Sequence, residues 1–282
     1  MRVLTWNVQW CRGVDAPVDP ARIATEIRRL GDPDVVCLQE VASNYPELRG
    51  SEGEDQPHAL ADALPGYEVC LVSGVDVPAA GKNARGRRSR FGNLLLSRLP
   101  VGRILRHSLP WPPAPGVPSM PRVAVEVVVD APFGPVRVLS THIEYYSHEH
   151  RAAQVGRLRA LHAEACGEQR GTPEPGPFQG ARRPPCAILC GDFNLLPDDP
   201  LHGVMTSPIA PGVPLFVDAW SALHPGEPHP ATFRVHAREE GEAPYCCDYV
   251  FVSEDLLPRL RAIRIDGETQ ASDHQPVLVE LA

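Results

Sequence analysis

The stretch Ile188-Leu189-Cys190-Gly191-Asp192-Phe193-Asn194 joins an apolar run to the polar sequence Gly-Asp-x-Asn. The apolar residues predict a short buried strand from Cys186 to Cys190, with the polar residues directly after it. Asp192 and Asn194 are two residues apart, so in an extended chain both side chains lie on one face. There they can hold one water or phosphoryl oxygen between an acceptor and a donor. The alternative is an Asx turn that only ends the strand.

Two further polar residues belong to predicted strands near the N-terminus. Asn7 lies within the first of these strands, from Arg2 to Trp10, and Glu40 ends the next one, from Asp34 to Val41. A carboxamide or carboxylate in such a place needs a partner. Two interpretations of Glu40 therefore stay open, a ligand or a salt-bridged strand end.

Two histidines follow a similar pattern. Thr141-His142 ends a predicted strand from Val136, and Ser272-Asp273-His274 precedes the last strand, Val277 to Leu281. An aspartate beside a histidine, with a second carboxylate such as that of Asp248 in reach, can keep the imidazole charged as a donor to a phosphoryl oxygen. The alternatives are a structural strand-end histidine and a turn or helix cap.

In their order along the chain, these segments resemble the endonuclease/exonuclease/phosphatase superfamily, which includes deoxyribonuclease I. The motifs are Asn7, Glu40, Thr141-His142, Gly191-Asp192-x-Asn194, Asp248-Tyr249-Val250-Phe251 and Ser272-Asp273-His274-x-Pro276. The resemblance extends over residues 3 to 281 and implies an α/β fold: a four-layer α/β/β/α sandwich of two mixed sheets with outer helices. Its site lies where strand ends from both sheets converge. Since the motifs can converge only in one fold, we predict a single domain over residues 1–282.

The resemblance also implies a divalent cation, Mg²⁺ or Mn²⁺. Glu40 is then the principal metal ligand, with Asn7 and Asp273 near it. Few protein ligands and several waters suit Mg²⁺, which dehydrates reluctantly.

The remaining residues take catalytic roles by the same resemblance. Asp192 orients or deprotonates the attacking water, and Asn194 hydrogen-bonds the phosphoryl group. His142 and His274, the latter braced by Asp248, donate to the non-bridging oxygens. Metal and imidazoles together stabilise an in-line displacement at phosphorus.

Some motifs indicate the branch of the superfamily. Thr141-His142 stands where the abasic-site nucleases have a tyrosine-based motif, which argues against abasic-site repair. Glu144 after the histidine, Val217-Asp218-Ala219-Trp220 and Ala231-Thr232-Phe233 resemble the tyrosyl-DNA phosphodiesterase branch, with less specificity than the core motifs.

A basic segment precedes the predicted strand Phe91 to Ser97: five of the nine residues from Lys82 to Arg90 are Lys or Arg. We expect this segment to gather substrate phosphates through Arg87, Arg88, Arg90 and Asn93. The alternative is a solvated arginine-rich loop.

Tyr145-Tyr146 directly precedes a predicted helix from Ser147 to Cys166. The pair could stack on bases of a single strand. We favour the other interpretation, in which the tyrosines pack against the start of that helix.

Composition limits the substrate and the location. A net charge of −8 and a pI near 5.8 argue against coating of long nucleic acid. No apolar run is long enough for a membrane span, and no apolar signal core follows Met1, so we expect a cytoplasmic monomer. The eight cysteines form no CxxC pair and are expected to be buried or idle thiols.

We therefore predict a metal-dependent phosphodiesterase that acts on nucleic acid or nucleic-acid ends. A short or structured end fits the net charge better than coating of a long duplex does. The first alternative is a phosphatase or phosphodiesterase for a phospholipid headgroup or inositol phosphate. A more distant one is a non-catalytic binding protein on the same fold.

Overall fold

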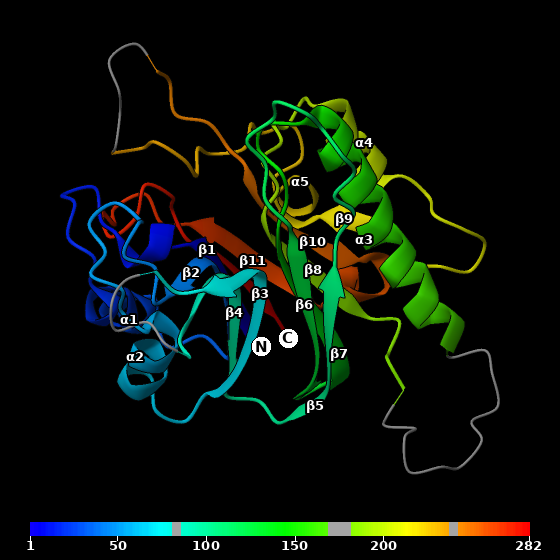
Figure 1. Ribbon diagram of the computed structural model, residues 1–282. Coiled ribbons are helices and arrows are strands. Elements are labelled where there is room, and N and C mark those ends of the chain that lie inside the picture. The colour runs from blue at the N-terminus through cyan, green and yellow to red at the C-terminus, as the bar shows by residue number, and fades with distance from the viewer. Residues whose placement is uncertain (81–85, 169–181, 237–241) are drawn as a thin grey trace.

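The computed structural model describes residues 1–80, 86–168, 182–236 and 242–282. Two six-stranded sheets pack face to face, and helices cover the outer side of each sheet (Figure 1). In each sheet one pair of neighbouring strands is parallel and the other pairs are antiparallel. This arrangement confirms the α/β fold of two mixed sheets with outer helices that the sequence predicted.

The first sheet joins the two ends of the chain, which lie close together in Figure 1. Its strand order is β11-β12-β1-β2-β4-β3. The strands are β1 (Arg2–Asn7), β2 (Val35–Ser43), β3 (Glu68–Pro78), β4 (Arg88–Ser97), β11 (Leu260–Ile265) and β12 (Val277–Leu281). Helices α1 (Pro20–Arg29) and α2 (Gln56–Ala63) lie outside it. Asp19 caps the start of α1, because its side chain accepts hydrogen bonds from two backbone N–H groups of the first turn.

The second sheet has the order β5-β6-β7-β8-β10-β9. Its strands are β5 (Val101–Ser108), β6 (Val123–Ala131), β7 (Gly134–His142), β8 (Ala187–Asp192), β9 (Phe216–Asp218) and β10 (Asp248–Ser253). Its outer side carries α3 (His148–Glu168) and α4 (Pro200–Thr206), with α5 (Ala219–Leu223) directly after β9. Short 3₁₀ helices, η1 (Gln9–Cys11) and η2 (Glu254–Arg259), complete the described elements.

Alternation along the strands divides the apolar core into three layers. In β1, Val3 faces the space between the sheets and Leu4 faces α1. In β7, Val138 faces the same space and Leu139 faces α3. The inner faces of both sheets are mainly apolar and become polar towards one end of the strands, where Gln39 Nε2 on β2 donates to Ser140 Oγ on β7 at 3.0 Å.

Two boundaries differ from the prediction. The first strand ends at Asn7, not at Trp10, because the backbone turns into η1 with positive φ angles at Gln9, Trp10 and Cys11. The helix predicted from Ser147 to Cys166 continues to Glu168 as α3. The proline-rich segment from Pro110 to Pro121 contains no helix or strand.

Seven of the eight cysteines are buried, and Cys186 is half-buried. Within the described ranges, none of the helices has the length and apolar character needed to cross a membrane.

Candidate active site

The central strands of the two sheets end beside one another, and each ends in a polar residue on its inner face. These residues continue the alternation of apolar side chains that pack between the sheets: Asn7, His142 and Asp192 follow Val3, Val138 and Ile188, and Asp248, the first residue of β10, precedes Val250. Because β8 lies between β7 and β10, its last residue pairs with the ends of both neighbours, in the pairs His142–Asp192 and Asp248–Asp192. The fold therefore brings together four residues that are distant in sequence.

Glu40 reaches the same place by a different route. Simple alternation along β2 would put its side chain on the outer face of the sheet. A bulge between Leu38 and Val41 and a positive φ of 58° at Glu40 turn the carboxylate inward. Such a backbone costs roughly 1 kcal/mol or more, and strain of this kind gathers at functional sites. The strand continues to Ser43, so Glu40 does not end it, contrary to the prediction.

Asn7 connects the predicted metal-binding residues. Its Nδ2 donates to Glu40 Oε1 at 3.1 Å and to Asp192 Oδ2 at 3.0 Å, and its Oδ1 accepts from the backbone N of Gln9 at 3.0 Å. The side chain of Gln9 in turn donates to Asp273 Oδ2 at 2.5 Å. With its amide hydrogens and oxygen so engaged, Asn7 holds the carboxylates in place.

Asp192 and Asn194 combine the two interpretations that the sequence left open. Asp192 Oδ1 accepts from the backbone N of Asn194 at 2.9 Å, which is an Asx turn. Its Oδ2 lies 3.4 Å from His142 Nε2, and Asn194 Nδ2 donates to the same nitrogen at 3.1 Å. Gly191 makes this packing possible, since a Cβ there would lie 1.9 Å from the carbonyl oxygen of Thr141.

His274 is held by a buried acid. Its Nδ1 lies 2.9 Å from Asp248 Oδ2, which also accepts from Thr232 Oγ1 at 2.6 Å. The ring of Phe233 packs on the imidazole with centroids 4.5 Å apart. Burial lowers the pKa of His274, but the charges of Asp248 and Asp192 outweigh it and raise the pKa to about 10. The imidazole is therefore charged at neutral pH, and its Nε2–H is free to donate because Asp192 Oδ2 is 3.7 Å away.

The pKa shifts of the other titratable groups favour the neutral form of each group, whereas that of His274 favours the charged form. Burial and the charge of Asp273 raise the pKa of Glu40 to about 7, and burial also raises the pKa of Asp273. Burial and the charge of Arg122 lower the pKa of His142 to about 3, so this ring is neutral. In the described part of the chain, no Lys or Arg forms an ion pair with Glu40, Asp192 or Asp273. The carboxylates thus carry uncompensated negative charge.

This arrangement fits a hard divalent cation. The carboxylate oxygens of Glu40 and Asp273 are the donors that Mg²⁺ and Mn²⁺ prefer. A second trio, Asp192, Cys247 and His274, also brings its ligand atoms within 4.8 Å. It suits a cation less well, because burial raises the pKa of the Cys247 thiol and the imidazole is already engaged by Asp248.

A cavity of about 480 Å³ opens onto these groups. Six of the eight predicted metal-binding and catalytic residues line it: Glu40, His142, Asp192, Asn194, Asp273 and His274. The other two, Asn7 and Asp248, are buried behind them and act through them. The sequence thus predicted a set of residues that the structure does bring together.

The sequence analysis missed two arginines that line the cavity, Arg122 and Arg234. Arg122 is only 6% exposed, and its Nε and one terminal nitrogen have no hydrogen-bond partner among the described residues. Its nearest acid is Glu144, with Arg122 Nε 3.6 Å from Oε2. The available signal was a charged residue at the start of the apolar strand Val123–Ala131.

The tyrosine pair also differs from the favoured interpretation. Tyr145 and Tyr146 are 46% and 60% exposed, and both line the cavity. Their rings form an edge-to-face pair with centroids 4.9 Å apart. Both rings are thus exposed at the cavity rather than buried against the start of α3.

The predicted substrate-binding segment lies beside the cavity rather than in it. Arg87 donates to Asn44, and Arg88 and Arg90 form ion pairs with Asp76 on the neighbouring strand β3. None of the three lines the cavity, because strand pairing directs them along the sheet edge.

Asn93 is 2% exposed and donates to the carbonyl oxygen of Val123 at 3.0 Å, so its amide nitrogen is already used. Lys82 and Arg85 lie outside the described residues. Phosphate binding by this segment stays a prediction. It requires a substrate that extends past the cavity, because the three arginines do not line it.

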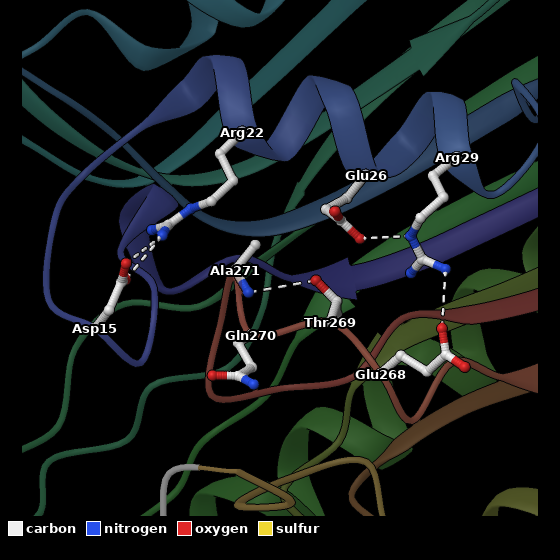
Figure 2. A pocket seen from close by; sticks show the side chains of 8 residues that line it. All are labelled: Asp15, Arg22, Glu26, Arg29, Glu268, Thr269, Gln270 and Ala271. Carbon is white, nitrogen blue, oxygen red and sulfur yellow. Dashed lines mark hydrogen bonds and ion pairs between the residues drawn. The ribbon is translucent and has the colours of Figure 1, made fainter.

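A second hollow, of about 360 Å³, lies between α1 and residues 268–271 (Figure 2). Its charged side chains are paired: Arg22 with Asp15 at 2.8 Å, and Arg29 with Glu26 at 2.8 Å and Glu268 at 3.8 Å. Paired charges at the surface have little reactivity to offer. Its larger volume, and carboxylates that form no ion pair with Lys or Arg among the described residues, therefore both select the first cavity as the candidate active site.

Comparison with known proteins gives one family match. Residues 4–274 match the model of the endonuclease/exonuclease/phosphatase family. No curated protein matches the sequence.

Solved structures of similar fold cover this chain completely. One is an endonuclease/exonuclease/phosphatase protein from Beutenbergia cavernae DSM 12333, with 26% identity, a TM-score of 0.68 and 72% of its own chain covered. Truncated TDP2 from Caenorhabditis elegans has 18% identity, a TM-score of 0.63 and 97% coverage. The mannosyl-6-phosphatase Bt3783 from Bacteroides thetaiotaomicron VPI-5482 has 17% identity, a TM-score of 0.64 and 99% coverage. The last two likenesses concern the fold alone.

Proposed function

The chain belongs to the endonuclease/exonuclease/phosphatase family, and on that premise we propose that it hydrolyses a phosphodiester in nucleic acid, or at a nucleic-acid end, with a divalent cation. One observation carries the proposal. Three carboxylates that form no ion pair with Lys or Arg among the described residues line one cavity with a charged, buried imidazole: Glu40, Asp192, Asp273 and His274. Negative charge that attracts a cation, beside a positive donor, is what displacement at phosphorus requires.

Glu40 and Asp273 are the residues that would hold Mg²⁺ or Mn²⁺. When bound, the cation supplies Lewis-acid polarisation of a phosphoryl oxygen and neutralises developing charge. Asn7 was predicted as a ligand. Its amide nitrogen faces Glu40 and its oxygen accepts from Gln9 N, so we assign it to orienting the carboxylate instead.

Asp192 is the proton acceptor for the attacking water. Its Oδ1 is held by the backbone N of Asn194, and its Oδ2 faces the cavity beside Asn7 and His142. The water oxygen bonds to phosphorus while the ester bond opposite breaks, and the water proton moves to Asp192 Oδ2.

Three donors are placed to stabilise the charge that develops on the non-bridging oxygens. His274 is a charged imidazolium and donates through its Nε2–H. His142 is neutral, and because Asn194 Nδ2 donates to its Nε2, the ring proton lies on Nδ1. Arg122 adds guanidinium N–H groups that have no partner in the described structure.

The aromatic lining supports a nucleic-acid substrate. Exposed Tyr145 and Tyr146 border the cavity together with Trp10 and Phe233, and aromatic faces stack on bases irrespective of sequence. With the net charge of −8, this favours a short or single-stranded end over a long duplex. A monomeric, single-domain, cytoplasmic protein remains our prediction.

A phosphate-ester panel tests the proposal. We would measure hydrolysis of bis-p-nitrophenyl phosphate, p-nitrophenyl phosphate, a single-stranded oligonucleotide and an inositol phosphate, with Mg²⁺, Mn²⁺ or chelator. Diester and oligonucleotide hydrolysis should require the cation, be lost in Asp192→Ala, and persist in the control Asp15→Ala from the other hollow. Preference for the monoester or inositol phosphate would replace the nucleic-acid assignment, and no hydrolysis of any ester would refute the proposal.

A further inference from the structure

A second group of metal-ligand side chains lies outside the active-site cavity, where α4, β9 and the segment after α5 meet. His202 Nε2 lies 2.8 Å from Asp218 Oδ2, and His229 Nε2 lies 2.7 Å from the same oxygen. All three ligand atoms lie within 4.8 Å of one another. Two imidazoles and one carboxylate therefore converge on a point that the proposed reaction does not use.

Neighbouring backbone and aromatic groups fix the orientation of the three side chains. Asp218 Oδ1 accepts from the backbone N of Trp220 at 2.8 Å, which leaves Oδ2 for the histidines. The His202 ring packs against Tyr249 and Phe251, with centroids 5.1 and 5.6 Å apart, and the His229 ring lies 5.6 Å from Tyr249. Fixed ring and carboxylate orientations of this kind are what metal sites obtain from their surroundings.

The carboxylate is nearly enclosed. The side chain of Asp218 is 4% exposed, and those of His202 and His229 are 13% and 12% exposed. In the residues the structure describes, the ion-pair partners of Asp218 are the imidazoles of His202 and His229, and no Lys or Arg pairs with it.

A very small cavity lies against the group. It measures about 10 Å³, roughly the space of one water molecule, and Asp218, His229 and Trp220 are among its lining residues. The indole nitrogen of Trp220 is buried without a hydrogen-bond partner in the described structure. There is thus room for one water beside the ligands, and a donor able to hold it.

We propose that His202, Asp218 and His229 bind a transition-metal cation of the Zn²⁺ type, with water in the fourth position. Two imidazoles and a carboxylate suit Zn²⁺, whereas Mg²⁺ and Ca²⁺ prefer all-oxygen sets. Tetrahedral bonds of about 2.0–2.1 Å separate ligand atoms by roughly 3.3 Å, so the present contacts must open by about half an ångström. On binding, each imidazole presents the Nε2 lone pair and carries its proton on Nδ1.

The site lies close to the support of the catalytic histidine. His229 is three residues before Thr232, whose hydroxyl donates to Asp248 at 2.6 Å, and Phe233 packs on His274. A cation here would tie α4 and β9 to the segment that holds the His274–Asp248 pair. Its function is to position that segment, separately from the cation proposed at Glu40.

Cobalt substitution tests the site, because four-coordinate Co²⁺ absorbs visibly and six-coordinate Co²⁺ in an oxygen site absorbs weakly. We would titrate chelator-treated, full-length Glu40→Gln protein with Co²⁺ and then with Zn²⁺. The substitution weakens cation binding in the active site, so that the second site is observed alone. We expect strong bands at a single equivalent, their loss on adding Zn²⁺, and a rise in melting temperature of about 5 °C with excess Zn²⁺.

Variants assign the signal to these residues. In the same background, His202→Ala and His229→Gln should lose the bands and the thermal shift, whereas His224→Ala, a nearby histidine outside the trio, should keep both. His229→Gln keeps a donor for Asp218, so it guards against loss of folding. Absence of the bands and the shift in the Glu40→Gln protein, or their survival in both ligand variants, would overturn the proposal and leave a hydrogen-bonded clamp.

Discussion

The active-site cavity and the hollow beside α1 in Figure 2 are both lined by acidic side chains, with volumes of about 480 and 360 Å³. In the hollow, Asp15 and Glu26 each lie 2.8 Å from an arginine nitrogen. In the cavity, Glu40 and Asp273 have no such partner among the described residues, and their pKa values are raised.

The difference shows that missing counter-charge marks the reactive region. An exposed ion pair contributes about 0–1 kcal/mol and costs the fold little. Buried carboxylates without a cationic partner are costly, because they lose hydration without compensation. A fold retains them where a ligand supplies the charge, so the charge pattern and the larger volume identify the same region.

The largest expected effect comes from removing one unpaired carboxylate. Glu40→Gln should lower kcat/KM by about 10³-fold and weaken Mg²⁺ binding, because the amide has no charge to attract the cation. Glu26→Gln in the hollow should stay within about twofold of wild type, since its partner Arg29 is exposed. Steady-state kinetics over a Mg²⁺ titration measures both, and equal losses in the two variants would contradict the comparison.

The order of motifs identified the residues at the strand ends, because strand geometry makes their direction predictable. Asn7, His142, Asp192 and Asp248 all follow from alternation and the pairing of β8 with its neighbours. The direction of the Glu40 side chain does not follow from alternation, because it depends on a backbone bulge. No local residue pattern predicts the positive φ at Glu40. Its assignment rested on the family resemblance.

The surroundings of the site were harder to predict, because they depend on contacts between distant segments. Arg88 appeared free in the sequence, but strand pairing places it beside Asp76. Tyr145 and Tyr146 precede a helix, yet their exposure depends on where that helix starts relative to the cavity. Charge and motif spacing give no information on such tertiary pairings.

The next effect concerns the buried pair on the opposite side of the cavity. His274→Ala should lower kcat by ~100-fold or more, because a charged donor to the phosphoryl oxygens is lost. Asp248→Asn should act through pH: without that charge the pKa of His274 falls, so activity should decline at lower pH than in wild type. The pH profile of kcat/KM decides this, and an unchanged alkaline limb in Asp248→Asn would refute the role assigned to Asp248.

Stability should reveal the uncompensated charge directly. The folded protein raises the pKa of Glu40 from its ordinary value to about 7, so between these values the folded state holds a proton that the unfolded state has released. The stability of the metal-free protein should therefore fall as pH rises towards 7, by up to roughly 2 kcal/mol from this group. Urea unfolding in chelator at pH 5 and pH 8 measures it.

Glu40→Gln provides the control for that measurement, because it removes the titrating group and keeps the shape. The fall in unfolding free energy should be smaller in the variant than in wild type, and excess Mg²⁺ should stabilise wild type more at pH 8 than at pH 5. An identical pH dependence in both proteins would show that the negative charge of the cavity is already compensated.

The smallest effect is expected in the hollow beside α1. Arg29 contacts Glu26, Asp266 and Glu268, and its side chain is 39% exposed. Solvent and salt screen such pairs, so Arg29→Gln should lower the unfolding free energy by about 0.5 kcal/mol and leave kcat/KM unchanged. Raising the salt concentration should reduce even this difference, because the added salt screens the exposed ion pairs further. A fall in kcat/KM at unchanged stability would mean that paired charges also serve the reaction, and counter-charge would no longer distinguish the two regions.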